Sequence, residues 1–122
     1  MKTLYLVRHA KSSWDDPLLD DFSRPLNARG KRDAPTMAKR LKEKRVVLDL
    51  LLTSPAARAL STAKEMAKVL NYDEHKIKTL PDLYHASPEK ILHTLKQVKD
   101  NCHVVMLVGH NPGLTEFVDE LT

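Results

Sequence analysis

The chain has 122 residues, of which 42% are hydrophobic and 30% are charged, and its formal net charge is +4. This length supports one domain at most, with room to bury about two-thirds of the surface of the unfolded chain. The composition is typical of a soluble globular protein, and no apolar run approaches the roughly 20 residues that a membrane span requires. We therefore expect residues 1–122 to form a single domain that does not enter a membrane.

The start of the chain gives a weaker indication of location, and the single cysteine gives a weaker indication of function. The start of the chain is itself a predicted strand, without a basic-then-apolar leader, so a secretory signal is not predicted and a cytoplasmic location is expected. Cys102 is the only cysteine and cannot form an internal disulfide. It lies beside a predicted core strand, and we interpret it as structural.

The first predicted element is a strand formed by the apolar run Leu4–Val7. A run of large and β-branched residues that is too short for a core helix is typical of a strand buried on both faces, and such strands usually belong to parallel sheets. Open parallel sheets bind ligands just beyond the carboxyl ends of their strands. Because Arg8 and His9 follow this strand directly, we expect both at a ligand-binding edge.

A long loop over the strand ends is predicted for residues 11–27, which contain two prolines, four aspartates and no sustained periodicity. Loops of this length are often functional. The four aspartates lack the spacing of a calcium-binding loop. We interpret them as a polar surface segment: Asp15, Asp16, Asp20 and Asp21.

The first predicted helix follows Asn27, a candidate N-cap. Its apolar residues recur with helical spacing at Ala34, Met37, Ala38 and Leu41. Pro35 is expected either to lie within the first turns or to kink the helix. Eight lysine and arginine residues lie between Arg29 and Arg45. We interpret them as a solvated helix face, and nucleic-acid binding is the alternative that their charge leaves open.

A second strand is predicted over Val46–Leu52, and Ser54-Pro55 after it is typical of a helix start, with serine as the cap and proline in the first turn. The apolar face of this helix leaves Arg58 on another side, near the helix N-terminus. Amide groups of a first helical turn favour an anion, and an arginine beside them adds a bidentate donor for phosphate or carboxylate.

The remaining elements complete an alternation of strands and helices. A short strand over Ile77–Leu80 precedes Ser87-Pro88, a second serine-proline helix start. The apolar run Val104–Val108 ends in Gly109-His110, and a last helix follows with apolar positions at Leu114, Phe117, Val118 and Leu121. This order predicts an α/β fold of three layers, α/β/α, with a mainly parallel sheet.

Two predicted strands thus lead into histidines, His9 and His110, and a third leads to Arg58. If these strands are neighbours, two imidazoles and two guanidinium groups converge, although each residue alone is more commonly a solvated boundary residue. A neutral imidazole is a nucleophile toward phosphorus, and guanidinium groups neutralise the oxygens of a transferring phosphoryl group. No metal or cofactor is predicted, because no Walker loop, HExxH motif or metal-ligand spacing occurs. We assign no task to the other histidines: His75, His85, His93 and His103.

Four motifs occur in an order that is familiar from one family. They are Val7-Arg8-His9-Ala10, Arg24-Pro25-Leu26-Asn27, Ser54-Pro55-Ala56-Ala57-Arg58-Ala59 and Gly109-His110-Asn111-Pro112. In these motifs the chain resembles the histidine phosphatase superfamily, the phosphoglycerate mutase-like or RHG proteins, and in particular the SixA-type phosphohistidine phosphatases. The resemblance covers most of the chain and implies a phosphoglycerate mutase-like fold.

The resemblance also implies roles for individual residues. It makes His9 the nucleophile that becomes phosphorylated, Arg8 and Arg58 phosphate ligands, and His110 a second imidazole that binds phosphate and stabilises the transition state. Arg24 resembles a further phosphate contact of the SixA-like branch. The chemistry implied requires no metal.

Three positions depart from the family pattern. Ala10 replaces the glycine after the histidine, which narrows the backbone freedom of the turn, and Asp15 stands where mutase relatives have an asparagine that contacts phosphate. The proton-donating carboxylate of the family aligns best with Asp82, which is our candidate proton donor. Matching domains usually continue with further strand and helix beyond the equivalent of Thr122, so the resemblance also implies a longer native chain.

The leading hypothesis is a metal-independent phosphatase that acts through a phosphohistidine intermediate on a phosphorylated substrate, with a phosphohistidine-bearing protein as the expected partner. A phosphomonoesterase acting on small molecules is the alternative within the same superfamily. From other classes, the alternatives are a non-catalytic phosphate-binding or interaction module and a nucleic-acid binder that uses Arg29–Arg45. The sequence does not determine the oligomeric state.

Overall fold

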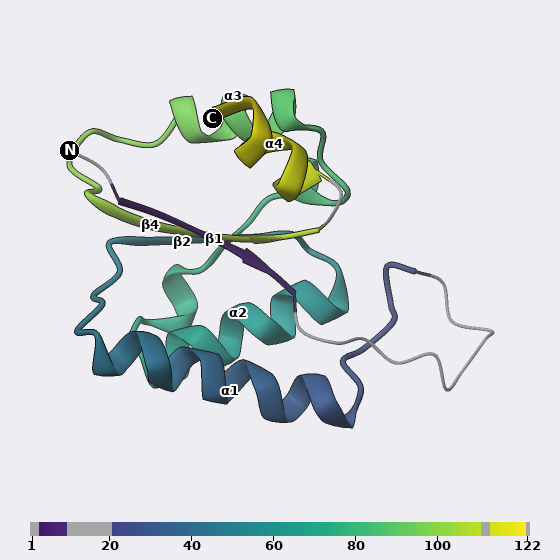
Figure 1. The fold of residues 1–122 in the computed structure, drawn as a ribbon, viewed down its shortest axis with the longest axis vertical. Coiled ribbons are helices and arrows are strands. Elements are labelled where there is room, and N and C mark those ends of the chain that lie inside the picture. Colours follow the sequence, from purple (N-terminus) through teal and green to yellow (C-terminus); the bar gives the residue numbers. More distant parts are fainter. Residues whose placement is uncertain (1–2, 10–20, 111–112, 122) are drawn as a thin grey trace.

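A computed structural model describes residues 3–9, 21–110 and 113–121 of the chain. Within these residues, a four-stranded parallel sheet is covered on one face by two helices and on the other face by two more (Figure 1). The strands are β1 (Thr3–Arg8), β2 (Leu50–Thr53), β3 (Lys78–Thr79) and β4 (Val104–Gly109). The helices are α1 (Ala28–Glu43), α2 (Ala57–Val69), α3 (Pro88–Lys96) and α4 (Gly113–Leu121). Two 3₁₀ turns, η1 (Glu74–Lys76) and η2 (Pro81–Leu83), flank β3. The predicted three-layer α/β/α fold and its element order are confirmed.

The described sheet has the strand order β1-β4-β2-β3, so β4 lies between β1 and β2 and pairs with both. In β1 and β4, Val7 pairs with Val108 and Arg8 pairs with Gly109. In β2, Thr53 also pairs with Val108. The carboxyl ends of three strands are therefore level, and the residues that follow them emerge at one edge of the sheet.

The two faces of the sheet bury separate apolar clusters. Tyr5 and Val7 of β1 pack into the cluster under α1 and α2, whereas Leu4 and Leu6 pack into the cluster under α3 and α4. This alternation is the geometry of a strand, in which successive side chains point to opposite faces. Because both faces are covered, apolar residues at both sets of positions are partly or fully buried, which explains the unbroken apolar run that predicts the strand.

The second strand is shorter than predicted, because some of the residues before it end helix α1 and another bonds to the start of β4. Arg45 has a positive φ of 61°, and the amide of Val46 donates to the carbonyl of Leu41, which closes the end of α1. The carboxylate of Asp49 accepts hydrogen bonds from the amides of His103 and Val104, both at 2.9 Å. Regular pairing of β2 consequently begins only at Leu50.

Two of the three predicted helix starts are confirmed. The side chain of Asn27 accepts a hydrogen bond from the amide of Gly30 at 2.8 Å, and Ser87 caps α3 through the amide of Lys90 at 3.3 Å. Helix α1 runs continuously with Pro35 inside it, at the end of its second turn. The third prediction is wrong at Ser54, because α2 begins at Ala57 and its N-cap residue is Ala56.

No described helix combines the length and apolar character needed to cross a membrane.

Candidate active site

Two histidines lie side by side at the carboxyl edge of the sheet. His9 follows β1 and His110 follows β4, and the amide of His9 donates to the carbonyl of Gly109 at 3.1 Å. The centroids of the two imidazole rings are 5.2 Å apart. The parallel register between β1 and β4 therefore brings together residues that are about a hundred positions apart in the sequence.

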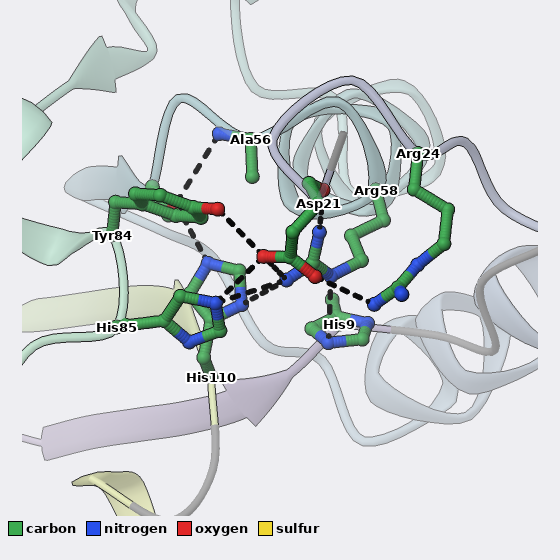
Figure 2. Close-up of polar contacts among 9 residues, drawn as sticks. His9, Asp21, Arg24, Ala56, Arg58, Tyr84, His85 and His110 are labelled. Atoms are coloured by element: carbon green, nitrogen blue, oxygen red, sulfur yellow. Dashed lines mark hydrogen bonds and ion pairs between the residues drawn. The ribbon is translucent and has the colours of Figure 1, made fainter. Parts of the chain in front are cut away.

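The guanidinium group of Arg58 connects the two imidazoles (Figure 2). Arg58 lies in the first turn of α2 and is only 1% exposed. Its Nε donates to Nε2 of His9 at 3.2 Å, and its Nη2 lies 3.3 Å from Nδ1 of His110. Burial of a guanidinium group requires that its donors be satisfied, so these contacts hold both rings in defined orientations.

These contacts also determine where the imidazole protons lie. Arginine only donates hydrogen bonds, so Nε2 of His9 and Nδ1 of His110 are acceptors without protons. The Nε2–H group of His110 then donates to Oγ of Ser54 at 2.7 Å. The same oxygen accepts from the amide of Ala56 at 3.3 Å. Ser54 therefore orients His110 and is not a conventional helix cap.

Burial next to positive charge keeps His110 neutral. His110 is 3% exposed, and burial, followed by the charges of Arg58, His9 and His85, lowers its pKa from 6.5 to about 3. Asp21 opposes this shift without reversing it. The imidazole of His110 is thus available at neutral pH in its uncharged form.

The carboxylate of Asp21 lies at the centre of the remaining contacts (Figure 2). Its Oδ2 accepts from Nη2 of Arg58 at 2.9 Å, the hydroxyl of Tyr84 at 2.6 Å and Nε2 of His85 at 2.7 Å. Its Oδ1 pairs with Nη2 of Arg24 at 2.9 Å. In addition, its backbone carbonyl accepts from Nη1 of Arg58. The interpretation of Asp21 as part of a polar surface segment is therefore wrong.

Asp21 remains ionised in this environment. Burial alone would raise its pKa, but the hydrogen bonds from Tyr84, His85 and Arg58, together with the charge of Arg58, outweigh that effect and hold the pKa well below 3.8. Its side chain is still 38% exposed. The carboxylate is thus a charged group at the rim of the cluster, with access to solvent.

The other predicted site residues differ in how closely they approach this cluster. The side chain of Arg24 is 12% exposed and reaches the cluster through Asp21. Arg8, the last residue of β1, and Asp82 in η2 are both exposed. Among residues 3–9, 21–110 and 113–121, no hydrogen bond or ion pair joins either of these two side chains to the cluster. Ala10 and Asp15 lie outside the described residues.

Tyr84 and His85 join the cluster from the loop before α3. The ring centroid of His110 is 5.5 Å from that of Tyr84 and 4.6 Å from that of His85. His85 adopts a positive φ of 49°, which is uncommon outside glycine and is enriched at functional sites. No sequence pattern indicates a task for His85, and the structure shows it in contact with Asp21.

A glycine at the start of α4 allows the loop that carries Tyr84 and His85 to pack closely against this helix. A Cβ atom on Gly113 would lie 2.0 Å from the carbonyl oxygen of Ala86, which is shorter than any real contact. Only glycine therefore allows α4 to approach the residue that follows His85. Gly113 lies three residues after His110 in the sequence. Its close approach to the loop could not be predicted from the sequence, because it depends on how the loops fold.

Within the described residues, no group of three or more histidine, cysteine, aspartate or glutamate side chains is arranged to hold a metal ion.

Residues 4–101 match the model of the histidine phosphatase superfamily, branch 1. An uncharacterized chloroplastic protein of Arabidopsis thaliana is 33% identical over 99% of this chain, and the chain spans only 59% of that relative's length. A SixA protein from Agrobacterium tumefaciens, provisionally assigned as a phosphohistidine phosphatase, is 33% identical, with a TM-score of 0.88 over 96% of this chain and 74% of its own.

A second solved structure is similar, the protein histidine phosphatase SixA complexed with tungstate. It is 27% identical and has a TM-score of 0.86 over 97% of this chain and 75% of its own. Both structures agree with the SixA-type resemblance of the sequence motifs. From the family match and these two folds, we conclude that the chain belongs to the histidine phosphatase superfamily.

Proposed function

We propose that the protein containing this chain is a phosphatase that removes phosphoryl groups through a phosphohistidine intermediate on His9, and that its substrate is a phosphohistidine-bearing protein. The observation that carries the proposal is the contact between the unprotonated Nε2 of His9 and the buried guanidinium group of Arg58. A phosphoryl group that replaces His9 as an acceptor of Arg58 Nε would lie next to the Nε2 lone pair that this exchange frees for attack.

The proposed reaction has two steps. In the first, Nε2 of His9 attacks phosphorus, a phosphorus–nitrogen bond forms, and the bond to the leaving group breaks. In the second, water attacks phosphorus, the bond to His9 breaks, and inorganic phosphate is released. The leaving group takes up one proton as it departs in the first step, and the attacking water loses one proton in the second. The two steps together therefore transfer the phosphoryl group to water with no net change in protons.

The buried guanidinium group of Arg58 and the groups beside it supply the electrostatic part of this chemistry. Charge on the equatorial oxygens of a transferring phosphoryl group is stabilised by preorganised donors, and such donors act more strongly where water is excluded. Arg58, at 1% exposed, is such a donor, and neutral His110 adds a second group beside it. Arg8 and Arg24 complete the proposed set of phosphate ligands.

The relatives support this assignment at the level of chemistry. Tungstate is a tetrahedral oxyanion, and one similar structure carries it in a protein histidine phosphatase. We carry over to this chain the binding of such an oxyanion at the His9–Arg58 edge.

The decisive variant is His9→Ala, assayed on p-nitrophenyl phosphate and on a phosphohistidine-bearing protein. We expect turnover to fall by at least about a thousandfold, because the covalent route is lost. His75→Ala, a change at an exposed histidine of η1, is the matched control and should retain activity. Undiminished turnover in His9→Ala would remove His9 from the mechanism.

A trapping experiment separates catalysis from mere binding. Mixing the wild-type protein with labelled substrate and quenching rapidly should yield acid-labile phosphate on His9. If phosphate binds and no such label forms under turnover conditions, the non-catalytic binding module is the better description.

The substrate is tested with a panel of phosphohistidine, phosphoserine and sugar phosphates, each measured with and without a chelator. Preference for phosphohistidine supports the proposed substrate, and preference for sugar phosphates supports the small-molecule phosphomonoesterase. Activity that survives the chelator agrees with a metal-independent mechanism.

Asp82 remains our candidate proton donor, and Asp82→Asn tests it. A phosphohistidine substrate needs the donor less, because its leaving imidazole can be protonated before it departs. We therefore expect this variant to slow alkyl phosphate hydrolysis more than phosphohistidine hydrolysis. Equal and intact rates on both substrates would show that this assignment is wrong.

A further inference from the structure

The Asp21 carboxylate makes contacts of the kind that a bound oxyanion would make. Two guanidinium groups, those of Arg58 and Arg24, donate to its two oxygens at 2.9 Å each. The hydroxyl of Tyr84 and Nε2 of His85 add shorter contacts at 2.6 and 2.7 Å. Four donors from three segments of the chain thus converge on one singly charged group, which is the arrangement of a preorganised anion site.

The donors that hold Asp21 are also the donors that the proposed function needs for a phosphoryl group. In Arg58, Nη1 and Nη2 both donate to Asp21, while Nε donates to His9 and Nη2 also approaches His110. The whole guanidinium group is therefore engaged with acceptors of the protein itself. A bidentate oxyanion on Arg58 has to replace some of these acceptors.

From this arrangement we propose that Asp21 is an affinity-determining residue, an internal anion that holds the phosphoryl site and is exchanged for the phosphoryl oxygens when substrate binds. The proposal rests on oxyanion binding at the His9–Arg58 edge, which is part of the proposed function. In the exchanged state Arg58 and Arg24 donate to the phosphoryl oxygens, and the Asp21 carboxylate turns to solvent.

The partial exposure of the Asp21 side chain makes this exchange feasible. The Asp21 side chain is 38% exposed, whereas Arg58 is 1% exposed and is held by the two imidazoles. The carboxylate can therefore regain water when it leaves, and the guanidinium group stays in place to receive the oxyanion. The backbone carbonyl of Asp21 is a separate acceptor for Arg58 and does not depend on the carboxylate.

An internal competitor lowers the affinity of every oxyanion by the same factor. The apparent dissociation constant equals the intrinsic one divided by the fraction of molecules in which the carboxylate has moved away. Removal of the carboxylate charge should therefore tighten the binding of all oxyanions together. A residue that only positions Arg58 would have the opposite effect, because its loss would weaken binding.

The test is the affinity for inorganic phosphate of the wild-type chain and of Asp21→Asn, measured by titration calorimetry and by competitive inhibition. Asparagine keeps the size of the side chain and removes its charge. We expect phosphate to bind at least about tenfold more tightly to the variant, a difference of about 1.4 kcal/mol. The KM for p-nitrophenyl phosphate should fall together with the phosphate dissociation constant.

Asp33→Asn is the matched control, because it makes the same change in net charge on the exposed face of α1. We expect its phosphate affinity to stay within about twofold of wild type, since distant exposed charges are screened by salt. If Asp33→Asn tightens phosphate binding as much as Asp21→Asn does, general electrostatic attraction explains the result and the proposal is overturned. Unchanged or weaker phosphate binding by Asp21→Asn also overturns it.

Tyr84→Phe provides a second route in case Asp21→Asn does not fold. This variant removes one hydrogen-bond donor of the carboxylate while retaining the aromatic ring. The Asp21 carboxylate should then be easier to displace, and phosphate should bind about two- to threefold more tightly. Equal or weaker binding by a folded Tyr84→Phe would contradict the proposal.

Binding of inorganic phosphate is measured without turnover, so the two proposals can fail separately. Tighter phosphate binding by Asp21→Asn in a chain that hydrolyses no substrate would support the exchange and refute the phosphatase. Hydrolysis by the wild-type chain without tighter binding by Asp21→Asn would support the phosphatase and refute the exchange.

Discussion

Two groups of basic side chains in this molecule carry the same kind of charge in opposite environments. Arg58 lies under the carboxyl edge of the sheet, 1% exposed and in contact with two imidazoles and a carboxylate. The eight lysine and arginine residues between Arg29 and Arg45 are all exposed. The second group outweighs the first in charge, yet the first forms the candidate site.

The two groups differ in whether their charges lost water when the chain folded. A buried guanidinium group has lost its water and requires fixed acceptors, so its neighbours become an ordered network. An exposed cation keeps its water, and its ion pairs contribute little. Arg29 and Asp33, for example, are 3.4 Å apart with side chains 67% and 51% exposed. The burial of a single charge is thus a better guide to function than the number of charges on the surface.

Among changes that test this comparison, the largest effect should come from Arg58→Lys, which keeps the charge and removes the fork of donors. We expect kcat/KM to fall by at least about a hundredfold, because one ammonium group cannot hold both imidazoles and an oxyanion together. The free energy of unfolding should fall by about 1–3 kcal/mol, since hydrogen bonds of buried groups are lost. Steady-state kinetics and denaturant titration measure the two effects.

Lys64→Arg is a control on the same helix, at an exposed position. It should leave both quantities close to wild type. If Arg58→Lys behaved like Lys64→Arg, the distinction between the buried and the exposed cations would be lost.

A second test uses the pH dependence of stability. His110 has a folded-state pKa of about 3 and an ordinary value of 6.5, so between these values the unfolded chain binds more protons at this position. The contribution of neutral His110 is therefore complete above about pH 6.5 and is lost as the pH falls. The slope from this one residue is at most about 1.4 kcal/mol per pH unit.

Denaturant titrations of His110→Gln between pH 4 and 7 should show a shallower decline toward acid than those of wild type. His75→Gln changes a side chain that is 87% exposed and should keep the wild-type slope. A wild-type slope in His110→Gln would mean that burial beside Arg58 does not depress the His110 pKa.

The smallest effect is expected on the exposed face of α1. The double change Lys39→Gln and Lys42→Gln should alter the free energy of unfolding by less than about 0.5 kcal/mol and turnover by less than about twofold. Affinity for double-stranded DNA should be weak in wild type and insensitive to the change. Tight, steeply salt-dependent DNA binding that these changes weaken would instead revive the nucleic-acid alternative.

The sequence was most informative where a pattern repeats along one element. Apolar runs predicted the strands, and the caps Asn27 and Ser87 marked where two helices begin, because these signals act over a few neighbouring residues. The approach of His9, Arg58 and His110 was also predictable, because parallel strands align their carboxyl ends. The family motifs added roles to those residues, and these roles remain predictions.

What sequence patterns alone could not predict came from loops. Asp21 lies in an acidic stretch without periodicity, and Tyr84 and His85 lie in the loop between η2 and α3, so no local rule indicated that their side chains meet. Ser54 matched a helix cap and instead bonds to His110, because a buried imidazole competes for its hydroxyl.

The amino-acid sequence by itself thus determined the alternation of strands and helices, the family and the edge at which a site would form. Only the tertiary structure decided which loop side chains complete that site. The physical reason is that hydrophobic periodicity and helix capping are local, whereas the charge of one buried arginine is satisfied by whichever acceptors the folded loops bring within hydrogen-bonding distance. Asp21 is the clearest case, since its carboxylate reaches Arg58 across 37 positions of the chain.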